Sequence, residues 1–366
     1  MDEDVPASLQ SEIETFKDAF ASLADAELAC ATAKVEPEAL EAEIAKLLDA
    51  NRPVVQEVYD PNKPPQLDHI YGGQLKVKVS RPPRALQVLL VEFNFGIDCG
   101  FDSLLLGYEY HDGVWTRVLR WESPAYNRID SSFGDFFNYV LLPGKAPQEW
   151  SIAVAHGHPW CTSNLSAFDI DLLKPVRDHA GQHVLAHKEF YYRRDTDPVM
   201  RAEPDGFELK MTGESIDPDI VMRPVIYRYR VTDGTLERVQ PIANNGRDFV
   251  DEWLESPLND SARWSSTTNL LKLERVHEGI RKLTDSRDPN AKEFPLLNFG
   301  PVRGCSDSRA HFQVELDEEW VDSKGGSRAG EPTYFQIDEG KNSFTMVSAG
   351  LNADARCTGS DIMAKN

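Results

Sequence analysis

Residues 104–121 are LLLGYEYHDGVWTRVLRW, and this stretch decides the predicted class of fold. Two runs rich in aliphatic and aromatic residues flank Asp112-Gly113, a dipeptide that supplies the positive φ angles of a two-residue β-hairpin turn. Asp205-Gly206 and Asp233-Gly234 occur in similar settings further along the chain. These repeated hairpin signals predict antiparallel β-sheets.

The segments around this hairpin extend the same pattern in both directions. Residues 74–80 alternate apolar and polar side chains, as a half-buried strand does, and residues 86–95 are apolar enough for a central strand. Helical spacing returns at 248–255 and 270–283, and residues 294–357 again resemble strands. We therefore expect a mainly β or α+β fold: an antiparallel β-rich body, an N-terminal helical hairpin and a short helical segment before the last strands.

The N-terminal residues 8–50 have the spacing of two helices with one apolar seam, which Pro37 divides. The seam residues, at spacings of three and four, are Leu9, Ile13, Phe16, Phe20, Leu23, Leu40, Ile44 and Leu47. Two interpretations are open. The helices form a coiled coil that binds a protein partner or self-associates, or they dock on their own domain.

The expected organisation has five parts. Residues 1–50 form the acidic helical hairpin, and 51–68 form a proline-rich linker. An antiparallel β-rich region follows at 69–243, then a helical segment at 244–290. The C-terminal strands, 291–366, are expected to pack with the β-rich region.

Charge and hydropathy exclude some classes of function. The chain has 39 basic and 60 acidic residues, a formal net charge of −21, and residues 1–50 contribute −10 of it from thirteen acids and three lysines. Such an excess disfavours nucleic acid as a partner, because phosphate binding needs a basic surface. No apolar run approaches the roughly 18 residues of a membrane helix. A hydrophobic share of 41% indicates a soluble folded protein.

Five cysteines bear on the compartment. Cys99, Cys161, Cys305 and Cys357 stand beside glycine or polar residues in loops that suit disulfides, and four cysteines allow three pairings. Cys30 would remain on a helix, and five scattered free thiols are the alternative. Met1 is followed by three acidic residues, where a signal peptide would have basic ones. We expect either a cytoplasmic protein or an extracytoplasmic one whose signal peptide is outside this sequence, and the loop cysteines favour the second.

Histidines gather in one part of the chain, with five of the nine between residues 156 and 187. His156 and His158 follow an apolar run, and residues two apart on a strand share a face. Asp169 and Asp171 are related in the same way, and His183 and His187 are four apart. Imidazoles with a carboxylate suit Zn²⁺ or Fe²⁺, whose bound water could act as a nucleophile. Hydrogen-bonded loop histidines and the wet face of a strand are the alternative interpretation.

Two classes of function remain. The first is a non-catalytic binding or assembly module with the helical hairpin as a partner surface. The second is a metal-dependent hydrolase or oxygenase with its site around His156 and His158. The sequence has no GxSxG elbow, P-loop, GxGxxG or HExxH motif. The binding module is therefore the preferred hypothesis.

Overall fold

The computed structural model describes residues 7–50, 71–83, 87–97, 100–123, 136–157 without 145, 147 and 148, 165–177, 181–193, 198–220, 222–286 and 291–363. The predicted linker, 51–68, lies outside them. The chain divides into two compact units: unit 1 is 1–194 with 233–235, and unit 2 is 195–232 with 236–366. Their boundary falls inside the segment 69–243 described above as one region. Among the described helices, none is long and apolar enough to cross a membrane.

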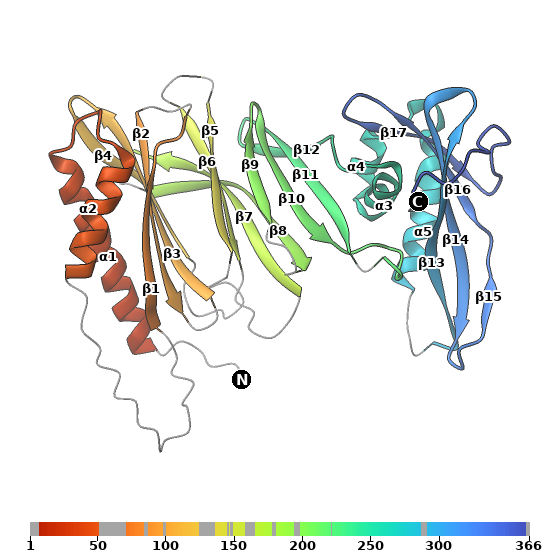
Figure 1. Ribbon diagram of the computed structural model, residues 1–366, viewed down its shortest axis with the longest axis horizontal. Helices are drawn as coiled ribbons and strands as arrows, with labels where there is room; N and C mark the ends of the chain where they lie inside the picture. Colours follow the sequence, from red (N-terminus) through yellow and green to blue (C-terminus); the bar gives the residue numbers. More distant parts are fainter. Residues whose placement is uncertain are drawn as a thin grey trace, which may run out of the picture. The chain divides into compact units, whose positions relative to one another are not determined.

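The predicted fold class is confirmed: the described strands form four antiparallel sheets, with two helices at the N-terminus and more helices before the last strands (Figure 1). The first sheet contains β1 (Tyr71–Ser80), β2 (Val88–Ile97), β3 (Gly100–His111) and β4 (Val114–Glu122) in that order. Asp112 and Gly113 join β3 to β4 with φ angles of 52° and 89°, as the hairpin signal predicts.

The second sheet of unit 1 faces the first. It contains β5 (Phe137–Pro143), β6 (Trp150–Gly157), β7 (Leu165–Val176) and β8 (Gly181–Arg193), again in chain order. One buried cluster joins Leu105 and Trp121 of the β1–β4 sheet to Ile152 and Leu173 of the β5–β8 sheet. The side chains that alternate onto these inner faces therefore fill the space between two sheets, as in a β-sandwich.

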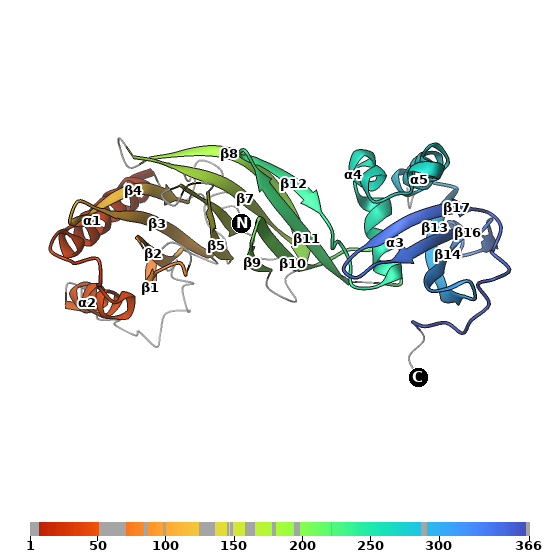
Figure 2. The same ribbon diagram turned by 90° about the horizontal axis from the view of Figure 1, so that it is seen from above.

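The N-terminal helices α1 (Ala7–Ala29) and α2 (Pro37–Ala50) cover the other face of the β1–β4 sheet (Figure 2). Phe20 of α1 is buried and stacks on Phe93 of β2 with ring centroids 4.0 Å apart. Lys17 and Asp102 form a buried ion pair of 2.8 Å between α1 and β3. The apolar seam of the helices thus packs on their own sheet, which is one of the two interpretations of its spacing.

Unit 2 begins with a third sheet, in the order β12 (Thr235–Val239), β11 (Arg223–Thr232), β10 (Gly206–Gly213) and β9 (Val199–Glu203). The Asp233-Gly234 turn has the expected positive φ angles of 49° and 82°. The Asp205-Gly206 prediction was wrong in detail, because Gly206 is a strand residue paired with both Glu203 and Arg230. A Cβ atom on Gly206 would lie 1.9 Å from the carbonyl oxygen of Tyr229, so this glycine permits close approach of two backbones.

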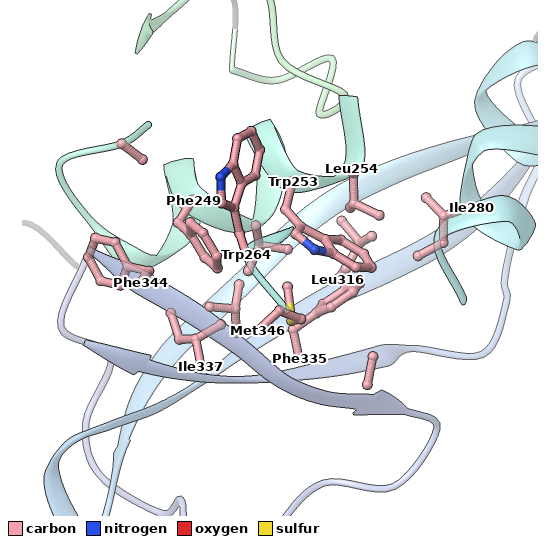
Figure 3. Packing of buried hydrophobic residues seen from close by; sticks show 14 of the residues in the cluster. Phe249, Trp253, Leu254, Trp264, Ile280, Leu316, Phe335, Ile337, Phe344 and Met346 are labelled. Carbon is pink, nitrogen blue, oxygen red and sulfur yellow. The ribbon is translucent and has the colours of Figure 1, made fainter. Parts of the chain in front are cut away.

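The fourth sheet carries the main core of unit 2. Its order is β13 (Glu293–Cys305), β14 (Ser308–Asp322), β16 (Thr333–Glu339) and β17 (Phe344–Gly350), with β15 (Ser327–Ala329) paired to β14. Before it come α3 (Gly246–Glu255), α4 (Leu258–Arg263), a 3₁₀ turn (Thr267–Asn269) and α5 (Leu270–Asp285). Figure 3 shows Trp253 and Leu254 of α3 and Ile280 of α5 packed over Leu316 and Phe335 of the sheet.

Two acidic residues of α3, Asp251 and Glu252, are buried on its other side, where they contact arginines of the β9–β12 sheet. The carboxylate of Glu252 accepts hydrogen bonds from Arg223 at 2.8 Å and from Arg238 at 2.5 Å, and Asp251 lies 3.1 Å from Arg223. Burial would raise the pKa of Glu252, but the two guanidinium groups outweigh it and hold that pKa below its ordinary value. Helix α3 therefore joins two sheets, through an ionic contact on one side and an apolar contact on the other.

Candidate functional site

The β5–β8 sheet brings four of the six predicted site residues together. His156 on β6 is directly opposite Asp169 on β7, and Asp171 on β7 is directly opposite His187 on β8. Directly opposed residues of an antiparallel sheet point to the same side, and residues two apart on one strand do as well. These four side chains therefore share one face of the sheet, which we call the His/Asp cluster.

Asp171 is the centre of the His/Asp cluster. Its Oδ2 lies 3.2 Å from Nε2 of His156, and its Oδ1 lies 2.8 Å from Nδ1 of His187. The other ring nitrogen of His187, Nε2, is 3.7 Å from Oδ1 of Asp169. One carboxylate thus holds an imidazole on each oxygen.

The surroundings shift the pKa values of Asp171 and His187 in opposite directions. Burial would raise the pKa of Asp171, but hydrogen bonds from His156 and His187 outweigh it and hold that pKa below its ordinary value. The hydrogen bond to Asp171 raises the pKa of His187 above its ordinary value, against a smaller opposing effect of burial. Each shift stabilises the charged form of its own group, the imidazolium of His187 and the carboxylate of Asp171.

The two histidines differ in exposure, which determines what could reach them. The side chain of His156 is 7% exposed and its ring centroid lies 5.1 Å from that of Trp121, at the margin of the core between the sheets. The side chain of His187 is 56% exposed. A ligand would meet His187 first and His156 last. As a donor set, two imidazoles and two carboxylates suit Zn²⁺ or Fe²⁺ once the rings turn from Asp171 toward a common ion.

The structure does not place the other two predicted residues, His158 and His183, in the His/Asp cluster. His158 lies outside the described residues. His183 is exposed and opposite Lys174, because the register of β8 against β7 shifts by one residue between Leu172 and Leu173. This β-bulge puts His183 and His187 on opposite faces of the sheet, although their spacing of four predicts a shared face.

A second feature of unit 1 is the outward side of the helices, which we call the acidic face. Its members are exposed carboxylates of α1, α2 and their connection: Glu12, Glu14, Asp18, Glu36, Glu38, Glu43 and Asp49. Lys34 and Lys46 are the exposed basic residues of the same described segment, 10–49. Asp18 is paired with Arg120 at 2.6 Å and Glu43 with Lys46 at 3.6 Å.

The sequence did not point to a buried ionic network around Glu109 of β3. Arg177 donates two hydrogen bonds to Glu109, at 2.9 and 2.8 Å, and the indole of Trp150 donates a third at 2.6 Å. Burial would raise the pKa of Glu109, but these hydrogen bonds and one from His111 outweigh it and lower that pKa. Glu109 ties the two sheets of unit 1 together. Glu109 is two residues from Gly107 and four from Leu105, which predicts that it faces the other sheet. This spacing does not predict which residues Glu109 contacts.

A further group of metal-ligand side chains was also missed. One ligand atom each from Cys305, Asp307 and His311 lies within 4.8 Å of the others in unit 2. Their spacing, Cys-x-Asp-x₃-His around a tight turn, is the signal that could have found them. The disulfide expected among the loop cysteines is present as Cys305–Cys357, with an S–S distance of 1.98 Å.

The remaining cysteines divide into two groups. Cys99 and Cys161 lie outside the described residues. Cys30 is a free, exposed thiol directly after α1.

Comparison with known proteins adds no functional assignment. The chain matches no protein-family model, and no curated protein matches its sequence.

Proposed function

We propose that the chain is a non-catalytic binding module, and that unit 1 presents the acidic face to a partner protein with a positively charged surface. The observation that carries this proposal is the difference between the two sides of the helices, one buried and apolar and the other exposed and acidic. Their apolar seam is used on the β1–β4 sheet, whereas their outward side carries seven exposed acids and two exposed lysines.

The acidic face is held in place before any partner arrives. Trp115 donates a hydrogen bond to the carbonyl of Thr32 at 3.1 Å, between the two helices, and the hydroxyl of Tyr108 donates one to Asp25 of α1 at 2.9 Å. The buried Lys17–Asp102 pair adds an ionic contact. A surface that is already ordered loses little conformational entropy on binding, which favours a recognition role.

Charge gives this surface its selectivity. Like charges gathered on the exposed positions of one helix pair produce a potential that attracts a cationic partner and repels anionic ones, most strongly at low salt. Nucleic acids and acidic proteins are thereby disfavoured. A basic protein surface is the complementary class.

The test is carbodiimide cross-linking of the full chain in an extract of its source cells, which joins surface carboxylates to lysines of a bound protein. We expect a basic protein to be linked to the acidic face, and the links to disappear when Glu12, Glu14 and Glu43 are changed to Gln. Glu→Gln removes charge with little change in helix propensity.

A matched control removes the same charge elsewhere, with Glu278→Gln, Glu331→Gln and Glu339→Gln on exposed positions of unit 2. The control should keep the cross-links. Equal loss in both triple variants, or no loss in either, would contradict the proposed surface.

The His/Asp cluster supports a second candidate, a metal-dependent hydrolase or oxygenase. The observation that favours it is the placement of two imidazoles around one carboxylate on the face predicted for a metal site. Metal analysis and thermal melting with added Zn²⁺ or Fe²⁺ test it, comparing His187→Ala with His183→Ala as the control on the same strand. Bound metal that depends on His187 and not on His183 supports the candidate, and metal-independent stability contradicts it.

A further inference from the structure

A compact group of sulfur, imidazole and carboxylate side chains lies at one end of the β13–β17 sheet, far in sequence from both sites above. Cys305 ends β13, Asp307 is in the following turn, and His311 is on β14. Cys357 comes from the segment after β17 and is bonded to Cys305. Nδ1 of His311 is 3.3 Å from Oδ2 of Asp307. Both sulfurs are buried, and the carboxylate of Asp307 is 30% exposed, so the group has one side toward solvent.

A chain of hydrogen bonds decides which nitrogen of His311 is available. The backbone N–H of Asp354 donates to Oε1 of Gln313 at 2.7 Å, so that oxygen is an acceptor. The amide nitrogen of Gln336 donates to the same oxygen at 2.8 Å, which leaves Oε1 of Gln336 for the ring of His311 at 3.1 Å. Nε2 of His311 must therefore carry a hydrogen, because a carbonyl oxygen only accepts.

It follows that the lone pair of neutral His311 is on Nδ1, the nitrogen that faces Asp307. Nδ1 faces Oδ2 of Asp307 at 3.3 Å and Oδ1 of Asp338 at 3.8 Å, and the guanidinium of Arg356 contacts the same Oδ2 at 2.7 Å. A metal cation bound at Nδ1 would add positive charge between the ring and these carboxylates. Histidines that bind metals commonly donate their other ring N–H to a fixed acceptor, which orients the ring. Gln336 supplies that acceptor here.

Thiolate, imidazole and carboxylate together are the donors that Zn²⁺ prefers in four-coordinate sites. Zinc–sulfur distances of about 2.3 Å in a tetrahedron place two thiolates roughly 3.8 Å apart. The Cα atoms of Cys305 and Cys357 are 3.9 Å apart, so rotation of the two side chains suffices to separate sulfurs that are now bonded.

We propose that Cys305, Cys357, His311 and Asp307 bind one Zn²⁺ ion when the Cys305–Cys357 disulfide is reduced. A dithiol reductant supplies two electrons and two protons, the S–S bond breaks to give two thiols, and the reductant becomes a disulfide. Zn²⁺ then displaces both thiol protons to solvent and binds the two thiolates, Nδ1 of His311 and one oxygen of Asp307. The reduced chain therefore replaces one cross-link by another.

The chain around the site is held independently of the disulfide, so reduction leaves the four side chains near one another. The backbone N–H of Ser306 donates to the carbonyl of Arg356 at 2.9 Å, and that of Ile362 donates to Val302 at 2.9 Å. Arg356 also contacts Asp307 at 2.7 Å and holds Asp354. Arg356 contacts Oδ2 of Asp307, the oxygen that also faces His311, so the carboxylate must turn to offer Oδ1 to the metal while Oδ2 keeps Arg356.

The experiment uses the full chain with Cys30, Cys99 and Cys161 changed to Ser, so that the remaining thiols are those of the site. The protein is reduced with a phosphine, freed of metal with a chelator, and titrated with Co²⁺ and then Zn²⁺ under inert gas. We expect one Co²⁺ per chain with a thiolate-to-cobalt absorption band, displaced by one Zn²⁺. The oxidised protein should show no such band.

Two variants test the other ligands. His311→Gln and Asp307→Asn should each weaken Zn²⁺ binding by more than about tenfold, since loss of a residue that only orients a ligand already costs about that much. His187→Ala, in the His/Asp cluster, is the control and should leave the band unchanged. Circular dichroism of each reduced variant shows whether it is folded.

The absence of a thiolate band in folded, reduced protein would overturn the proposal. A band that persists unchanged in both His311→Gln and Asp307→Asn would overturn it as well. Because these measurements involve neither the acidic face nor a partner, their outcome is independent of the proposed binding function.

Discussion

Replacing Phe335 by Ala tests whether unit 2 unfolds as a block separate from unit 1. Phe335 is fully buried on β16, and its ring centroid lies 6.2 Å from that of Trp253 in a T-shaped contact (Figure 3). A Phe→Ala change in a packed core costs about 3–5 kcal/mol, because the removed ring leaves a cavity that neighbours only partly fill. Unit 2 has about 170 residues, for which 1 kcal/mol corresponds to roughly 2–4 °C in melting temperature. The melting transition of unit 2 should therefore fall by about 10 °C.

The assay is differential scanning calorimetry of the full chain, with Phe93→Ala as the matched variant. Phe93 is equally buried, in the core between α1 and the β1–β4 sheet of unit 1. We expect two transitions, of which Phe335→Ala lowers one and Phe93→Ala lowers the other. Phe335→Leu removes less volume and should cost under about 1.5 kcal/mol.

The reasoning would be refuted if the chain melted in a single transition that both variants lowered equally. It would also be refuted if Phe335→Ala and Phe93→Ala lowered the same one of two transitions. Either result would mean that the two cores unfold together, so the division into units would not be a division in stability.

Four further predictions concern His187, Glu109, Gly206 and Gly279. In an NMR titration the pKa of His187 should exceed 6.5, and Asp171→Asn should lower that pKa. The stability that His187 contributes is complete below about pH 6.5 and is lost as the pH rises through the folded-state pKa of His187. In urea titrations at pH 7, Glu109→Gln should lower the free energy of unfolding by about 1.5–3 kcal/mol. This loss should become smaller as the pH falls from 4.5 through the lowered pKa of Glu109, because the carboxylate of the unchanged protein is then protonated as well. In the same assay Gly206→Ala should lower the free energy of unfolding by at least about 1–3 kcal/mol, because its Cβ would lie 1.9 Å from a carbonyl oxygen. Gly279→Ala in α5 should raise the free energy of unfolding by about 0.5–1 kcal/mol, because its Cβ would have no other atom within 4 Å.

Local signals predicted much of the secondary structure. The Asp112-Gly113 turn forms as expected because two adjacent residues with positive φ close a hairpin without reference to the rest of the chain. The prediction from the same signal was wrong in detail at Asp205-Gly206. Residues 204 and 205 form the turn there, and Gly206 is already part of the strand. That position is decided by the approach of β11, which is 23 residues away at Tyr229.

The His/Asp cluster was predicted in part for the same reason. Alternation along a strand puts Asp169 and Asp171 on one face, and the pairing of β6 with β7 adds His156. His183 required the register of β8, and one extra residue in that strand reverses its face. A bulge of this kind leaves no mark in the spacing of the histidines.

Burial of charge was the least predictable feature. Asp251 and Glu252 have the spacing of a solvated helix face, yet both are buried against the β9–β12 sheet, where Arg223 contacts both carboxylates and Arg238 also contacts Glu252. Hydrophobic periodicity reports which side of a helix is apolar. It says nothing about what covers the polar side.

The sequence by itself determined the antiparallel β-rich class, the two N-terminal helices and their seam, and the helical segment before the last strands, because these depend on backbone preferences and on patterns a few residues long. Tertiary structure alone decided which surfaces are covered, and it brought Asp171 between two imidazoles and Cys357 to Cys305. Such contacts join residues between 15 and 52 positions apart in the chain. They depend on strand register and on the packing of whole sheets, which the spacing of residues within one element does not record.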